Sequence, residues 1–196
     1  MSVKGTVMQD FGSNEESLQH RLKNILESGH HSDVVLKVGH QSFPAHKLIL
    51  SLRSPVFDAM FSHEMPESQT NEVHITDCDP EIFQVFLRYM YTGSCGTIEQ
   101  PLALYTVADR YGLQILKFEC TAAFASTFTP ENAIDKLIEA HENFCELPKQ
   151  RALQFICSTK STALKMKDAS RIENLIDSHP QLLKEFIGQY LNLISE

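Results

Sequence analysis

The sequence lacks the short motifs that mark several common enzyme classes. Its 8 glycines are scattered, and none falls into the spacing of a phosphate-binding or dinucleotide-binding loop. It contains no Gly-x-Ser-x-Gly segment, the turn that presents a catalytic serine. Its 5 cysteines are widely spaced without a Cys-x-x-Cys pair, which indicates reduced thiols rather than a disulfide framework. These absences favour a protein that is not an enzyme and needs no cofactor.

Basic clusters and long apolar runs are missing as well. The chain has 17 basic and 25 acidic residues, a formal net charge of -8. Binding to a phosphate backbone needs clustered Lys and Arg, so we expect no nucleic-acid partner. No apolar run is long enough to span a membrane, and the first residues lack the apolar segment of a secretory signal. We expect a nuclear or cytoplasmic protein, or one found in both places, with no membrane partner.

What is present suits one or two domains with a substantial core, since 42% of the 196 residues are hydrophobic. Residues 1–12 show no periodicity and are expected to be flexible. Residues 13–16 have the form of a capping box for a helix that ends near Gly29. The apolar stripe of this helix is Leu18, Leu22, Ile25 and Leu26. Taken alone, such a stripe can pack either on the core of its own domain or on a partner.

Residues 33–124 combine short strands with helices, as their apolar periodicity and turn residues indicate. Strands are predicted at 33–38, 41–43 and 73–75, the first two joined by a turn at 39–40. Helices are predicted at 45–52, from Ser54-Pro55 onward, from Asp79 to Gly93, at 102–111 and at 113–124.

Three features of this part of the chain are specific enough to test. Pro44 is expected to end the second strand, and the helix at 45–52 is expected to be mostly buried. Residues 62–72 are predicted to form a polar loop in which Met65 is the prominent apolar residue.

From residue 128 onward the sequence predicts only helices, and we expect this second unit to pack on the first. Its first helix is expected to be capped by Thr129 ahead of Pro130, and its last by Ser178 and His179 ahead of Pro180. A further helix is predicted between residues 166 and 176.

Two arrangements of polar side chains invite a chemical interpretation. His141 and Cys145, four residues apart on a predicted helix, are the best candidate metal pair, but two ligands without a second pair are a weak signal. Asp33 and His46 suggest part of a catalytic triad, but no activated nucleophile accompanies them. A structural role at a strand-to-helix junction is the better interpretation of the second pair. We therefore predict no metal site and no catalytic residue.

Four features occur along the chain in the order Asp33, Phe43-x-Ala45-His46-Lys47, Arg53-Ser54-Pro55-Val56-Phe57 and Tyr91-Thr92-Gly93. In this order they resemble the BTB/POZ family, with the greatest similarity to the BTB–BACK portion of the speckle-type POZ protein group of cullin-3 adaptors. The resemblance implies an α+β fold, in which a small sheet is flanked by helices and followed by a short all-helical BACK-like domain. It places the BTB/POZ domain at residues 13–127 and the BACK-like domain at 128–196.

The same resemblance implies partners and the residues that meet them. Leu18, Leu22 and Ile25 occupy positions where relatives form a homodimer, and Ile49 occupies the position that receives them. Met65-Pro66-Glu67 matches the hydrophobic-x-Glu motif with which relatives bind the cullin-3 N-terminal region, so Met65 and Glu67 are the expected cullin contacts. A second self-association surface is expected at Phe186, Ile187 and Tyr190.

Two functions remain open at this point. The first is a non-catalytic homodimeric adaptor that binds cullin-3 and recruits proteins for ubiquitination. The alternative is a BTB dimerisation scaffold, as in a transcriptional regulator, that does not bind cullin-3. Relatives carry a substrate-binding MATH domain before the BTB domain, so the resemblance also suggests a heterodimer with related MATH-BTB proteins.

Overall fold

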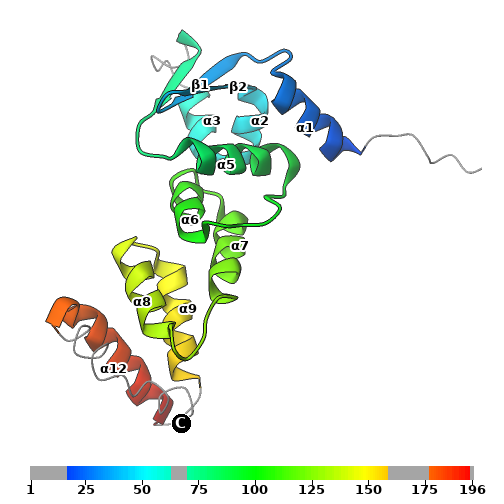
Figure 1. Ribbon diagram of the computed structural model, residues 1–196. Coiled ribbons are helices and arrows are strands. Elements are labelled where there is room, and N and C mark those ends of the chain that lie inside the picture. Colours follow the sequence, from blue (N-terminus) through cyan, green and yellow to red (C-terminus); the bar gives the residue numbers. More distant parts are fainter. Residues whose placement is uncertain (1–16, 63–69, 159–176, 195–196) are drawn as a thin grey trace, which may run out of the picture.

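The computed structural model of the chain describes residues 17–62, 70–158 and 177–194. A small sheet with helices against it forms the first part, and helices alone form the second (Figure 1). In chain order the first part comprises α1 (Leu18–Ser28), β1 (Val34–Val38), β2 (Gln41–Ala45), α2 (Lys47–Arg53), α3 (Pro55–Ser62), β3 (Glu72–Ile75), α5 (Pro80–Thr92), α6 (Pro101–Arg110) and α7 (Gln114–Ala125). The helices α8 (Ala133–Glu142), α9 (Glu146–Cys157) and α12 (Pro180–Ile194) follow.

The sheet has the strand order β2-β1-β3, in which β1 pairs antiparallel with β2 and parallel with β3. As predicted, alternate residues of β1 are buried, and a turn with Gly39 at φ 55° joins β1 to β2. The expectation that Pro44 ends the second strand is wrong, because β2 continues to Ala45 and Pro44 lies opposite Val35. A proline is tolerated there because β2 is an edge strand, where a missing N–H need not break the ladder.

The central helix α5 begins and ends as the sequence predicts. The side chain of Asp79 accepts a hydrogen bond from the backbone N–H of Glu81, and Pro80 occupies the first turn. Gly93 closes the helix at φ 73°. Seven side chains of α5 are buried, so the helix forms the middle of the main hydrophobic core.

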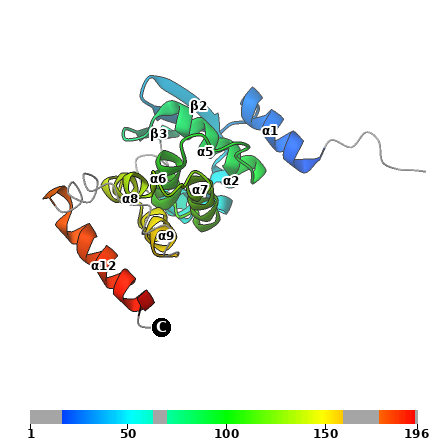
Figure 2. The same cartoon turned by 60° about the horizontal axis from the view of Figure 1, so that its bottom comes forward.

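The helical part packs directly against the first part. Cys145, just before α9, and Ala140 of α8 are buried in the main core, while a second core lies among α8, α9 and α12. The ring of Phe128 lies between the two cores, 5.2 Å from the ring of Phe124 and 5.5 Å from that of Phe155. In Figure 1, α5, then α6 and α7, then α8 and α9, and last α12 lie progressively farther below the sheet, and Figure 2 turns the molecule so that this lower end comes forward.

The predicted cap of the first helix in this part is wrong. Thr129 and Asn132 hydrogen-bond each other across a turn, and α8 begins only at Ala133. By contrast α12 begins at Pro180, as predicted. The helix predicted between residues 166 and 176 lies outside the described residues. Among the helices that the structure describes, none has the length and apolar character needed to cross a membrane.

Candidate protein-interaction surfaces

The first helix, α1, has one apolar side against its own domain and another in solvent. Leu22 and Leu26 are half-buried and pack on the main core. Leu18 is 72% exposed and Ile25 is 36% exposed. The helix is capped by Ser17, whose hydroxyl accepts from the backbone N–H of His20, whereas the predicted capping box at 13–16 lies outside the described residues.

The second helix, α2, presents leucines to solvent rather than burying them. Leu48 is 70% exposed and Leu52 is 75% exposed, while only Leu50 of α2 is fully buried. The expectation of a mostly buried helix is therefore wrong. Ile49 is half-buried and packs on the domain's own core. Leu48 and Leu52 were not singled out from the sequence, although their spacing of four residues places them on one helical face.

The helices α1 and α2 share a packing partner, α5. Both α1 and α2 pack on α5, and α1 lies at the side of the domain that carries α2 and α5 (Figures 1 and 2). We call the exposed residues of these helices the leucine face, defined as Leu18, Ile25, Leu48 and Leu52. Large exposed apolar side chains on two helices that both pack on α5 are candidates for a protein-interaction surface.

A hydrogen-bonded junction sets the start of α2 relative to the end of α1. The Oδ1 atom of Asp33 accepts from the backbone N–H of Lys47 at 2.7 Å. His46 Nε2 lies 2.8 Å from the carbonyl oxygen of His30, which can only accept, so Nε2 carries the proton. His46 Nδ1 then accepts from the hydroxyl of Tyr91, 2.7 Å away. Burial raises the pKa of this hydroxyl to about 12, so Tyr91 remains a neutral donor at physiological pH.

The hydrogen bonds of this junction give Asp33 and His46 the structural role that the sequence predicts for them. Oδ1 of Asp33 and both ring nitrogens of His46 form hydrogen bonds that fix the strand-to-helix connection. These hydrogen bonds hold the start of α2, and with it Leu48 and Leu52, in place.

Comparison with protein families decides what this part of the chain is. The BTB/POZ domain model matches residues 22–127, which is more than half of the 196 residues. The chain belongs to the BTB/POZ family. A solved structure, the BTB domain of zebrafish PATZ1, is similar to this chain at 24% sequence identity with a TM-score of 0.49, covering 59% of this chain and 99% of that one. BTB domains are protein–protein interaction modules that dimerise, so this chain carries such a module.

The predicted cullin contacts, Met65 and Glu67, lie outside the described residues of this BTB domain. The structure describes what flanks them: α3 ends at Ser62, and Thr70 precedes β3. The ammonium of Lys47 donates to Oδ1 of Asn71 at 2.5 Å, which ties the residue before β3 to α2. Glu72, the next residue and the first of β3, accepts a hydrogen bond from the ammonium of Lys37, which lowers the pKa of the Glu72 carboxyl.

The second predicted self-association surface lies on α12. Phe186 is half-buried and packs on the second core, and Ile187 is 46% exposed. The side chain of Tyr190 lies outside the described residues. Lys149 holds α12 to α9, since its ammonium lies 2.9 Å from carboxylate oxygens of Glu146 and of Glu185. Burial lowers the pKa of Lys149, but the two carboxylates outweigh it and raise the pKa overall.

His141 and Cys145, the best candidate metal pair, do not lie on one helix. α8 ends at Glu142, and Cys145 is buried just before α9, with its Sγ 3.4 Å from the carbonyl oxygen of Asn143. His141 instead contacts the ring of His179, with 5.6 Å between ring centroids. The prediction assumed an unbroken helix, whereas Phe144 adopts φ 56° and turns the chain. Within the described part of the chain, no three His, Cys, Asp or Glu side chains gather as a metal site would require.

Three further apolar residues outside the leucine face are exposed and were missed from the sequence. They are Ile115 and Phe118 on α7 and Phe144 between α8 and α9, with exposures of 69%, 61% and 93%. Sequence periodicity does not separate these residues from core positions, because they sit in segments rich in apolar residues.

Proposed function

We propose that this BTB protein is a non-catalytic homodimeric adaptor that binds the cullin-3 N-terminal region and recruits proteins for ubiquitination. The structural observation behind the homodimer in this proposal is the leucine face. Four apolar side chains on α1 and α2 are exposed in the single chain. Because BTB domains dimerise, a second subunit can cover them. Their exposure supports the proposal that a second copy of the chain covers this surface.

The energetics of this surface support a stable dimer. Full burial of a leucine or isoleucine side chain contributes about 1.5–3 kcal/mol. In a two-fold dimer each residue acts twice, because the same patch is used by both subunits. Leu22 and Ile49, which are half-buried in the single chain, have accessible area left to contribute at the edge of the contact.

The proposed cullin contact is Met65 with Glu67. It rests on the match of Met65-Pro66-Glu67 to the motif of cullin-binding relatives, and on its position between α3 and β3. Methionine is well suited to an adaptable apolar contact. Pro66 restricts the backbone between the two contact residues, which lowers the entropy lost on binding if the restricted conformation is the bound one.

The helical part is proposed to be a BACK-like domain that covers residues 128–196, following the BTB domain at 13–127. Its exposed Ile187, with Phe186 and Tyr190, would give a second self-association surface. We further propose that the leucine face also accepts a related MATH-BTB protein, which would supply substrate recognition through a heterodimer.

The test is calorimetric titration of the cullin-3 N-terminal region into the full chain, with the subunit count fixed first by light scattering. We expect one cullin per protomer, with binding weakened by Met65→Ala and by Glu67→Lys. Glu119→Lys, at an exposed glutamate of α7, is the charge-matched control and should bind normally. A well-folded dimer that does not bind at tens of micromolar would overturn the adaptor proposal and leave a dimerisation scaffold that acts without cullin-3.

A further inference from the structure

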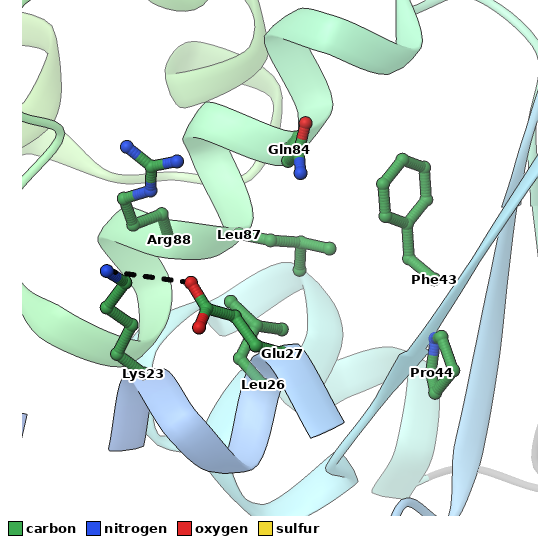
Figure 3. Close-up of a pocket in the computed structure, with 8 residues that line it drawn as sticks. All are labelled: Lys23, Leu26, Glu27, Phe43, Pro44, Gln84, Leu87 and Arg88. Carbon is green, nitrogen blue, oxygen red and sulfur yellow. Dashed lines mark ion pairs between the residues drawn. The ribbon is translucent and has the colours of Figure 1, made fainter. Parts of the chain in front are cut away.

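A pocket of about 270 Å³ lies under α1, on a side of the helix that does not belong to the leucine face (Figure 3). Three elements far apart in the sequence form it. Its lining comprises Lys23, Leu26 and Glu27 of α1, Phe43 and Pro44 of β2, and Gln84, Leu87 and Arg88 of α5. Leu18 and Ile25 do not line this pocket, so dimerisation through these two residues assigns it no role.

The floor of the pocket is apolar and held in place by the fold. Leu87 is 1% exposed, and the ring of Phe43 lies 5.7 Å from that of Phe83 in the core. Gly29 brings the end of α1 close to β2, since a Cβ atom there would lie 3.1 Å from Cβ of Pro44. The floor is therefore largely formed before any ligand arrives, as is usual for binding pockets.

The rim of the pocket carries two cations, Arg88 and Lys23. The guanidinium of Arg88 forms no hydrogen bond or ion pair with any other residue that the structure describes, although the Arg88 carbonyl oxygen accepts from the hydroxyl of Thr92. The ammonium of Lys23 is 3.6 Å from a carboxylate oxygen of Glu27, and both side chains are largely exposed. An exposed pair of this kind contributes little, so Lys23 can turn to an incoming anion at small cost. Figure 3 places Arg88 and Lys23 on one side of the pocket and Phe43 on the other.

We propose that this pocket binds the C-terminal residue of a peptide with an apolar side chain. The side chain would lie on Leu26, Phe43 and Leu87, and the terminal carboxylate between Arg88 and Lys23. An arginine and a lysine on one side of an apolar floor complement an anion joined to an apolar group.

The remaining polar groups of the rim favour a peptide over a simple acid. A peptide terminus also brings backbone N–H and C=O groups next to its carboxylate. Glu27 can accept from the N–H, and the side-chain amide of Gln84 can donate to the C=O or accept from the N–H. The Glu27 carboxylate, beside the cations Lys23 and Arg88, repels a ligand that is only anionic. The same carboxylate can bind a ligand that also has a hydrogen-bond donor.

The test is a titration of the full chain, followed by NMR chemical shifts, with N-acetyl-alanyl-leucine and with its C-terminal amide. We expect saturable shifts with the acid and about tenfold weaker binding of the amide, which has the same shape without the charge. Arg88→Gln should weaken binding of the acid about tenfold and leave the amide unchanged, while Arg151→Gln, at an exposed arginine of α9, should change neither.

Three results would overturn the proposal. The first is equal binding of the acid and the amide, and the second is binding of the acid that Arg88→Gln leaves intact. The third is equally strong binding of 4-methylpentanoate, which has the apolar group and the carboxylate without a peptide bond. None of these outcomes depends on dimerisation or on cullin-3.

Discussion

The hydroxyl oxygen of Tyr91 lies 2.7 Å from Nδ1 of His46 and 2.9 Å from the backbone nitrogen of the same residue. One side chain at the end of α5 thus donates to the imidazole and accepts from the N–H that precedes α2. Because His46 also donates to the carbonyl oxygen of His30, this contact couples three segments around the leucine face.

Removing the hydroxyl should destabilise the domain. Tyr91→Phe leaves the His46 N–H and Nδ1 without their partner, so we expect a loss of about 1–3 kcal/mol in the free energy of unfolding, measured by urea denaturation. Tyr105→Phe is the matched control, since its hydroxyl accepts from the N–H of Leu147 at a longer 3.4 Å and should contribute less. An equal loss of unfolding free energy in the two variants would show that the Tyr91–His46 hydrogen bonds contribute no more to stability than the Tyr105 hydrogen bond does.

The leucine face should govern self-association without governing folding. Leu18→Glu and Leu52→Glu each replace an exposed side chain, so the stability of the single chain should change by less than about 0.5 kcal/mol. The dissociation constant of the dimer should rise about tenfold or more, as followed by light scattering over a concentration series. Phe144→Glu, also at a highly exposed position, should leave the dimer intact. Dimers of unchanged affinity in both leucine variants would place the interface elsewhere.

Gly112 should be far less replaceable than Gly96. Both have positive φ, 74° and 72°, so alanine introduces a backbone strain of about 1 kcal/mol at either position. Only at Gly112 does the added Cβ meet a neighbour, Cγ of Pro55 at 2.8 Å, whereas nothing lies within 4 Å at Gly96. We expect Gly112→Ala to cost at least about 1 kcal/mol more than Gly96→Ala in chemical denaturation. Similar costs would mean that the α6–α7 turn can move away from α3.

Stability should fall in alkaline solution. Burial raises the pKa of the Cys120 thiol to about 12 and that of the Tyr111 phenol to about 12, from ordinary values of 9.0 and 10.0. Above the ordinary values the unfolded chain loses these protons first, so the stability that they provide is present below pH 9 and declines as the pH rises towards 12. Urea denaturation between about pH 8 and about pH 10.5 should show this decline.

Cys120→Ala provides the comparison for this pH dependence. Without the buried thiol the decline should be shallower, although the variant starts from a lower stability because it leaves a small cavity. An unchanged slope in Cys120→Ala would exclude this thiol as a source.

The sequence predicts helix ends and strand faces correctly where the requirement is set by neighbouring residues in the chain. Asp79 and Pro80 start α5, because the first turn of a helix needs a side-chain acceptor for its free N–H groups and tolerates the fixed φ of proline. Gly93 ends the helix, because the C-terminal cap needs a positive φ. The alternation in β1 is just as local. Errors arose where a distant element changed the outcome, as for Pro44, which stays in a strand because that strand is at the edge of the sheet.

The sequence by itself determined the order of the strands and helices that the structure describes, the turn at residues 39–40 and, through its motifs, the BTB family to which the chain belongs. The tertiary structure alone decided which apolar residues face solvent. Leu48, Leu50 and Leu52 are the same residue type on one short helix, yet only Leu50 is covered. Burial depends on which elements pack on which face of α2. The elements that pack on α2 are α3 and α5, and the hydrogen bond of His46 with Tyr91, 45 positions away in the chain, fixes the start of the helix.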